Sequence, residues 1–315
     1  MVEIMEETSG VTADSLIEFT EEEAELPSRH HWLIEILIQL VVTKPLGAVG
    51  LALVLLLVVM GVAAPLLTYS DPTVLHDGAQ LIAPGAEYFF GTDQLGRDIY
   101  SRIVYGARLS LLFGIAATFL GLSFATLVGT LSAFIGGKFD TVVQRFVDAM
   151  MSFPYLITML VVMALLGPGT LNIIFAFAIA SFAPSSRVVR SAVLSIRGSQ
   201  YILAARATGC TQKSIILTHV LPNVTAPLLI MASQGVGGAI LAEATLSFLG
   251  FGIPPPAPSW GRMLSSDGLS HMLNGPWLAI FPGIAISIAV FGFNMFGDAM
   301  RDLLDPKLVG GIGRL

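Results

Sequence analysis

The chain has 315 residues, 54% of them hydrophobic and only 12% charged, with a mean hydropathy of +0.79. Soluble domains carry about 25% charged residues, so this composition excludes an ordinary soluble protein and indicates a membrane protein. The net charge of −6 is local, because nine of the 22 acidic residues lie within residues 1–28, where there is no Lys or Arg.

Residues 1–28 come first in chain order. They lack the basic start and apolar core of a signal peptide, and their composition predicts a solvated, disordered acidic tail. Residues 29–68 are expected to form an interfacial segment and the first membrane-spanning helix, since residues 45–70 carry no charge and a span needs about 20 apolar residues. Residues 69–105 are expected to form an external segment.

Residues 106–300 predict five further spans, which gives an all-α integral membrane protein with six transmembrane helices. The uncharged or nearly uncharged runs that predict these spans are residues 109–137, 149–186, 214–261 and 268–297. The second of these runs is long, and the helix-breaking sequence GPGT at 167–170 divides it into two spans joined by a tight turn.

The distribution of basic residues predicts the orientation. Twelve basic residues lie on the side that holds both termini and four on the other side, so the positive-inside rule predicts cytoplasmic termini. The twelve are Arg29, Lys44, Lys138, Arg145, Arg187, Arg190, Arg197, Arg206, Lys213, Arg301, Lys307 and Arg314, and the four are Arg97, Arg102, Arg108 and Arg262. Residues 197–222 then form a cytoplasmic segment, residues 251–277 an external loop and residues 301–315 the cytoplasmic C-terminus.

The cytoplasmic segment 197–222 interrupts the apolar sequence with small and basic residues. As a single helix it would have a small face formed by Ala205, Gly209 and Gln212 and a basic face formed by Arg206 and Lys213. The small face suits the groove of a partner protein, and the cations suit acidic groups on that partner or anionic lipid headgroups. Pro222 is expected to break the backbone where the fifth span begins. The alternative is a basic interfacial loop that only anchors the chain to membrane lipid.

The same segment resembles a signature in the membrane subunits of ATP-binding-cassette importers. The signature is E-A-A, three residues, G, nine residues, I, one residue, L-P, and its matching positions here are Ala204, Ala205, Gly209, Leu221 and Pro222. Leu203 replaces the glutamate and His219 the isoleucine, and such variants are usual in the peptide-import branch. The resemblance implies a coupling helix that docks in a cleft of a separate ATPase, with the small residues in the cleft and an elbow at Leu-Pro.

Three further stretches resemble the permeases for oligopeptides, dipeptides and nickel. They are FGTDQLGRDIYSRIVYGARLSL at 90–111, EATLSFLGFGIPPPAPSWGRML at 243–264 and FNMFGDAMRDLLDPKL at 293–308. Together the matches run from about residue 33 to 308. The resemblance implies the type I importer permease fold in a bacterial or archaeal cell (inner) membrane.

The resemblance also implies the function and the partners. The chain would form a conduit with a second permease, as a heterodimer, and would work with two cytoplasmic ATPase subunits and an external substrate-binding protein. Di- or oligopeptides are the expected substrates, with nickel chelates and oligosaccharides as alternatives. The rival functions are a self-contained secondary transporter or channel, which needs its own coupling-ion site, and a membrane anchor for a signalling complex.

Glu243 and Trp260 are the candidate residues of the outer side. Glu243 lies 22 positions after Leu221, roughly 33 Å along a helix, which places it near the outer end of its span. It is expected either to line the outer conduit or to be an interfacial, hydrogen-bonded carboxylate. Trp260 and Trp277 are expected either to belong to the outer aromatic belt or to help an external loop to close the pathway.

Two charged stretches are expected at the surface. Thr92 or Asp93 is expected to cap a helix that begins near Leu95, and Arg97, Asp98 and Arg102 to form a charged outer surface. Residues Asp298, Arg301 and Asp305 share a helix face and are expected to form surface ion pairs.

No catalytic motif is present in the sequence. SAFIGGKF at 132–139 lacks the residues of a phosphate loop, and His30, His31 and His219 lack companion ligands at metal spacing. Cys210 is the only cysteine, so no intrachain disulfide can form. The chain has no basic, aromatic-interleaved surface for nucleic acid. We therefore expect neither enzyme activity nor a cofactor.

Overall fold

A computed structural model describes residue 38 and residues 40–304, and this part of the chain is helical, with one isolated bridge between Thr92 and Asp98. The acidic tail expected at 1–28 and residues 305–315 lie outside the described residues. The helices are α3 (Pro45–Val62), α4 (Ala64–Leu67), α5 (Ile99–Ile135), α6 (Gly137–Met151), α7 (Tyr155–Leu166), α8 (Thr170–Arg197), α9 (Gln200–Ala207), α10 (Gln212–Ile215), the π-helical turn η1 (Ile216–Val220), α11 (Leu221–Asn223), α12 (Thr225–Phe248), α13 (Trp260–Arg262), the π-helical turn η2 (Met263–Gly268) and α14 (Trp277–Leu304).

Five of the described helices are long and apolar enough to cross a membrane, namely α3, α5, α8, α12 and α14. A sixth crossing exists only if α6 and α7 are taken together, and these two helices meet at an angle of 90°. The region of the predicted third span is therefore formed by two helices at an angle rather than by one continuous helix. Pro154 explains the break, because it caps α7 and disfavours helical backbone in the residue before it. The predicted turn after α7 is confirmed, with Gly167 at φ +81° and Gly169 at φ +152°.

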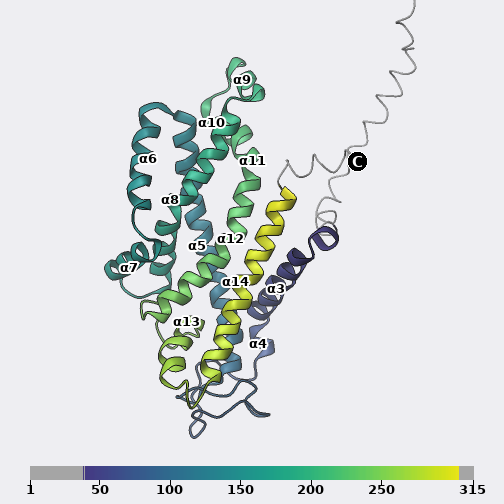
Figure 1. Ribbon diagram of the computed structural model, residues 1–315, viewed down its shortest axis with the longest axis vertical. Coiled ribbons are helices and arrows are strands. Elements are labelled where there is room, and N and C mark those ends of the chain that lie inside the picture. Colours follow the sequence, from purple (N-terminus) through teal and green to yellow (C-terminus); the bar gives the residue numbers. More distant parts are fainter. Residues whose placement is uncertain (1–37, 39, 305–315) are drawn as a thin grey trace, which may run out of the picture.

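The long helices form one elongated bundle around α5 (Figure 1). Helix α5 packs against α8, α12 and α3, and α14 packs against α3 and α12. Figure 1 shows α9 at one end of the bundle and α13, with the irregular segment 68–98, at the other. We call these the α9 end and the α13 end.

Small residues allow α3 and α14 to pack closely against each other. A Cβ atom added to Gly50 would lie 2.6 Å from the backbone nitrogen of Phe296, and one added to Gly47 would lie 2.2 Å from the Cβ of Ala299. Apolar solvent gives no hydrophobic drive between helices, so close backbone packing of this kind is what holds transmembrane helices together.

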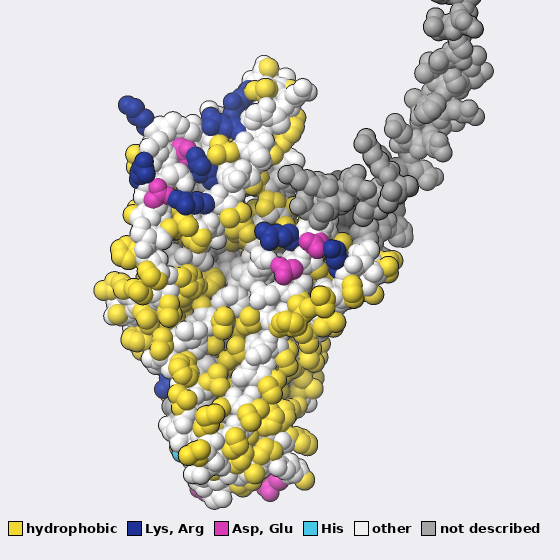
Figure 2. Space-filling view, in the orientation of Figure 1, with side chains coloured by type: hydrophobic (Ala, Val, Ile, Leu, Met, Phe, Trp, Pro, Cys, Tyr) yellow, Lys and Arg dark blue, Asp and Glu magenta, His cyan; other side chains and the backbone are white. Residues whose placement is uncertain are grey.

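The surface matches a protein that crosses a membrane. Apolar side chains cover most of the visible surface of the bundle, and Lys and Arg gather around the α9 end (Figure 2). Several aromatic and aliphatic side chains on the long helices are largely exposed, among them Phe119 at 74% and Leu171 at 70%. Exposed apolar side chains in this number are compatible with lipid rather than water around the helices.

Candidate functional site

The coupling segment 197–222 lies at the α9 end as two short helices rather than one. Helix α9 ends at Ala207, and Gly209 follows in the left-handed conformation at φ +82°. The N–H of Gly209 donates to the Arg206 carbonyl and that of Cys210 to the Ala205 carbonyl, both at 3.0 Å. This pair of bonds is the usual helix ending at a glycine. Residues 197–222 are therefore not a single helix, so Ala205, Gly209 and Gln212 do not share one helix face, and Gly209 is the sequence signal that indicates the ending.

The predicted coupling residues divide into an inner and an outer set. Ala205 is buried, together with Ile202, in a cluster that also contains Phe134 and Val193. The exposed members are Ala204, Arg206, Gly209, Lys213 and Pro222, and the half-buried ones are His219 and Leu221. The segment thus exposes small and basic side chains, while its buried residues hold it in place through apolar contacts.

The coupling segment packs on the last turn of α5. The guanidinium carbon of Arg206 lies 5.2 Å from the ring centroid of Phe134, a cation–π geometry. The Nη1 of Arg197 donates to the Ala133 carbonyl at 2.9 Å, which fixes the end of α8 to the same turn. Thr211 caps α10 through a bond from the Ser214 N–H.

One irregular residue precedes the long helix α12. Pro222 stands in the first turn of the three-residue helix α11, which continues directly from η1, and Val224 separates α11 from α12. The backbone break predicted at Pro222 therefore lies two residues later, at Val224. It connects the coupling segment directly to one long helix.

An ion-pair cluster that sequence reasoning missed joins α6 to α8 beside the coupling segment. Asp140 accepts two bonds from Arg190, and Ser132 donates to the same carboxylate at 2.5 Å. A cavity of about 530 Å³ opens here, lined by Asp140, Thr141, Gln144, Arg145, Asp148, Arg187 and Arg190. The partners lie 50 positions apart, so no local pattern indicates the pair.

Glu243 is buried near the α13 end, with 1% of its surface exposed. Its Oε1 accepts from the Ser247 hydroxyl at 2.6 Å and from the Ser259 hydroxyl at 2.8 Å. Ser247 belongs to the same helix, whereas Ser259 caps α13. The carboxylate therefore connects α12 with the loop that follows it.

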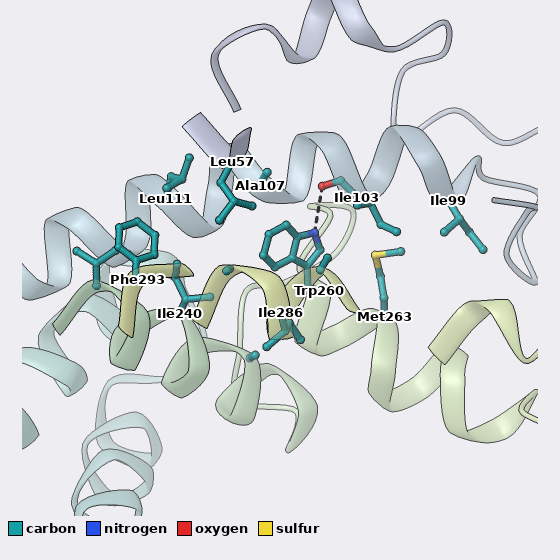
Figure 3. Close-up of a cluster of buried hydrophobic side chains, with 14 of the residues drawn as sticks. Leu57, Ile99, Ile103, Ala107, Leu111, Ile240, Trp260, Met263, Ile286 and Phe293 are labelled. Atoms are coloured by element: carbon teal, nitrogen blue, oxygen red, sulfur yellow. Dashed lines mark hydrogen bonds between the residues drawn. The ribbon is translucent and has the colours of Figure 1, made fainter. Parts of the chain in front are cut away.

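Trp260 lies in the apolar core rather than in an aromatic belt, and its ring is 1% exposed. Figure 3 shows the indole between α5 and the helices on its other side, with its Nε1 donating to the Ile103 carbonyl at 3.0 Å. The belt interpretation is therefore wrong for Trp260. Trp277 is half-buried, and its Nε1 donates to the Thr92 carbonyl at 3.2 Å.

The charges expected on the outer surface are buried in segment 68–98 and the first turn of α5. Asp93 is 2% exposed and pairs with Arg97 at 2.6 Å, and Arg102 is 3% exposed. The helix begins at Ile99 with Asp98 as its cap, through a bond from the Ser101 N–H, so the prediction of a cap at Thr92 or Asp93 is wrong. The pKa of Tyr69 is raised, mainly because the side chain is desolvated and to a smaller extent because its hydroxyl donates a hydrogen bond to Asp98.

The acidic residues of α14 contact other helices instead of each other. Asp298 accepts from the Gln234 amide at 2.9 Å, and Asp302 pairs at 2.6 Å with Lys44, the residue before α3. Asp305, the third residue of the expected surface network, lies outside the described residues. Within residues 40–304 no cluster of three or more His, Cys, Asp or Glu side chains could hold a metal ion.

A bundle of membrane-crossing helices with a small, basic segment at one end defines a multi-pass transport subunit. Residues 121–310 match the family model of the binding-protein-dependent transport system inner membrane component, and the chain belongs to this family. It is therefore an inner-membrane permease component of an ABC transporter and not its ATPase, and it works with ATPase, binding-protein and permease partners.

The relatives cover nearly the whole chain. The dipeptide transport system permease protein DppC of Alkalihalophilus pseudofirmus is 43% identical over 84% of this chain and 86% of the relative. The oligopeptide transport system permease protein OppC of Bacillus subtilis is 38% identical over 84% of this chain and 87% of the relative. The probable D,D-dipeptide transport system permease protein DdpC of Escherichia coli is 37% identical over 85% of this chain and 89% of the relative.

A solved structure shows the same fold. A chain of the MetNI methionine ABC transporter in an inward-facing conformation aligns with a TM-score of 0.53 and 20% sequence identity, over 64% of this chain and 96% of that chain. The architecture is therefore that of an ABC importer permease.

Proposed function

We propose that this chain is one of two different permease subunits in an ATP-driven importer of di- or oligopeptides. The named dipeptide and oligopeptide permeases that are 37–43% identical to it support this substrate class. In this assembly the two permeases form a heterodimer around the conduit, two ATPase subunits bind on the cytoplasmic side, and a binding protein delivers peptide from outside.

The observation that carries the proposal is the geometry of the coupling segment. The exposed small residues Ala204 and Gly209 alternate along the segment with the exposed cations Arg206 and Lys213, and Arg206 packs on the ring of Phe134. Small side chains let a partner approach the backbone of the segment closely, and the cations beside them give the contact surface a positive charge. The α9 end then faces the cytoplasm, with the ATPase seated on the segment and anionic lipid headgroups near the other basic groups of that end.

The coupling mechanism follows from how the segment is attached. ATP binding closes the ATPase dimer and moves the coupling segment, and the segment continues through α11 into α12 and rests on the last turn of α5. Motion at the cytoplasmic end therefore reaches the spans directly. On the outer side, Glu243 and Trp260 hold the structure that closes the pathway.

The substrate and the energy source are tested by peptide uptake in cells that express the whole transporter. We expect uptake of labelled di- or tripeptide to stop when ATP is depleted and to survive collapse of the proton gradient. Uptake that survives ATP loss would instead identify a secondary carrier. Competition by nickel chelates or oligosaccharides, with none by peptides, would overturn the substrate class.

The docking is tested with Cys210, which is exposed and is the only cysteine of the chain. Its thiol lies next to Gly209, so a bound ATPase should protect it from a maleimide in membrane vesicles. We expect slower labelling when the ATPase is present than after it is stripped with urea. Arg206→Glu with Lys213→Glu should remove the protection, whereas Arg301→Glu, an exposed control on α14, should retain it. Equal labelling under all conditions would contradict docking at this segment.

A further inference from the structure

We propose that Glu243 is a positioning residue that fastens the segment 250–263 to α12, so that motion of the coupling segment is carried to the opposite end of the bundle. This inference rests on the proposed function and adds a defined mechanical link to it. We call the segment 250–263 the inserted segment, because it leaves α12, enters the bundle and continues into α13.

The inserted segment is anchored inside the bundle at Ile253 and from Ser259 onward, while the prolines 254–256 between these anchors are exposed. Its members Ile253, Ser259, Trp260, Gly261 and Met263 are all buried, with 3% or less of the surface exposed for the four that are not glycine. Trp260 and Met263 belong to the same apolar cluster as residues of α3, α5, α12 and α14. A segment packed in this way moves together with whichever helices it is bonded to.

The bond to α12 is polar and is made by one oxygen atom. The Oε1 of Glu243 accepts from Ser259 of the inserted segment at 2.8 Å and from Ser247 at 2.6 Å. Ser247 in turn accepts from the Ile253 N–H at 3.3 Å. The carboxylate and the two hydroxyls thus join both ends of the inserted segment to the last turns of α12. We call these three side chains the clasp.

Close backbone contact leaves no room for the clasp to slide. A Cβ atom added to Gly261 would lie 2.1 Å from the Ala244 carbonyl oxygen, and one added to Gly252 would lie 1.8 Å from the Ser247 hydroxyl. Both distances are below van der Waals contact. Helix α12 and the inserted segment therefore behave as one body as long as the clasp holds.

The inserted segment is also fastened to α5. The Trp260 indole donates to the Ile103 carbonyl at 3.0 Å and lies against Gly106, where a Cβ atom would be 2.4 Å from Nε1. A buried hydrogen bond and a close contact thus fix the other side of the segment (Figure 3).

These two attachments join the inserted segment to two helices whose opposite ends lie at the coupling segment, where α12 begins and α5 ends. Helix α12 follows α11 after one residue and runs for 24 residues, roughly 36 Å. Helix α5 carries Ala133 and Phe134, on which Arg197 and Arg206 rest. A displacement of α12 against α5 at the coupling end therefore has to be taken up by the inserted segment at the far end, and the clasp transmits it.

The test uses the complete transporter in proteoliposomes and measures peptide imported per ATP hydrolysed. Glu243→Ala removes the acceptor for both serines, including the one bond that reaches Ser259 of the inserted segment. Loss of that one buried bond is worth about tenfold, so we expect import per ATP to fall by about this factor while ATP hydrolysis continues. Glu243→Gln keeps a carbonyl oxygen in this place and should restore the ratio. Thr245→Ala is the matched control, because this hydroxyl on the same helix donates only to the Leu241 carbonyl within it.

A second experiment separates transmission from simple loss of stability. The background is Cys210→Ser with Glu243→Ala, which removes the native thiol and the carboxylate. Ser247→Cys and Ser259→Cys are then added, because both hydroxyls bond to the same Glu243 oxygen and therefore lie close to each other. We expect oxidation to restore import per ATP and reduction to abolish it again. A disulfide that forms without restoring the ratio overturns the proposal, as does failure of the thiols to pair.

The outcomes distinguish this inference from the proposed function. If the unmodified transporter shows no ATP-dependent peptide uptake, the proposed function fails. If the unmodified transporter shows ATP-dependent uptake and the Glu243→Ala variant imports as much peptide per ATP, only the proposed role of the clasp is overturned. A Glu243→Ala complex that does not assemble, judged by loss of the ATPase during purification, would show that the residue has a structural role only.

Discussion

Asp140 on α6 and Arg190 on α8 lie 50 positions apart and form a two-point ion pair, with Nε 2.7 Å from Oδ1 and Nη2 2.5 Å from Oδ2. The side chains are 18% and 29% exposed, so water screens the pair only in part. Two parallel bonds fix the orientation as well as the distance of the partners. The pair anchors α6 near the point where it leaves α5, and the other end of α6 breaks into α7.

We expect Asp140→Ala or Arg190→Ala to lower the stability of the chain by about 1 to 3 kcal/mol, between the values for exposed and buried pairs. The exchanged double variant, Asp140→Arg with Arg190→Asp, should regain part of the loss. The change in stability is measured by thermal denaturation in detergent, as the fraction of the protein that remains monodisperse. Arg145→Ala is the control, since Arg145 is 80% exposed and lies 3.5 Å from Asp148. Equal losses from the control and from Asp140→Ala would contradict this account.

Gly209 tests the local geometry of the coupling segment. Nothing lies within 4 Å of a Cβ atom built at this position, so the cost of a side chain comes from the backbone at φ +82° alone. This conformation costs roughly 1 to 2 kcal/mol for most residues and less for Asn. We expect ATP-dependent uptake to decrease in the order Gly, Asn, Ala, Val. A Val variant as active as the Asn variant would show that the left-handed turn is not required.

Gly106 tests the packing of the Trp260 indole against α5. Gly106→Ala places a methyl group where the indole lies, and we expect a loss of about 1 to 3 kcal/mol from overpacking. Trp260→Phe removes the clash and also the hydrogen bond to Ile103, so the double variant should lose less than the sum of the two single variants. The same denaturation assay gives the coupling energy. Strict additivity would mean that the two residues do not contact each other in the membrane.

Gly50 tests the packing of α3 on α14. Gly50→Leu would drive its side chain into the backbone of Phe296 and the Cβ of Met295, at 2.6 and 2.8 Å for the Cβ atom alone. We expect the first span to separate from the bundle, seen as faster proteolysis of α3 in detergent. Gly238→Ala on α12 is the control, because a Cβ atom there meets nothing within 4 Å. A stable Gly50→Leu variant would show that α3 packs elsewhere.

Hydropathy predicts the spans well because the membrane imposes one length on each of them. It predicts α3, α5, α8, α12 and α14, and glycine chemistry predicts the turn between α7 and α8. It does not predict the bend between α6 and α7, because an uncharged run does not show whether its helix is straight. Pro154 is the available signal, and its effect depends on how the flanking residues pack.

The candidate site was predictable in position but not in detail. The spacing of small residues located the coupling segment, whereas the helix ending at Gly209 changes which side chains share a face. Arg97, Asp98 and Arg102 were expected at the surface because charges are usually solvated, yet all three are buried, and the two arginines lie beside the buried Asp93. Pairing of charges across turns depends on tertiary structure, and the same holds for the contact of Glu243 with Ser259.

The length of α5 has a consequence for the partner that binds the α9 end. Its 37 residues make a rod of roughly 55 Å, against about 30 Å for the hydrocarbon layer, so α5 is roughly 25 Å longer than an upright span needs. Its last turn supports the coupling segment through Ala133 and Phe134. The coupling segment is therefore held by a helix whose length exceeds the thickness of the lipid layer. A bilayer that becomes thicker or thinner changes how deep the bundle sits, while the platform presented to the ATPase keeps its shape.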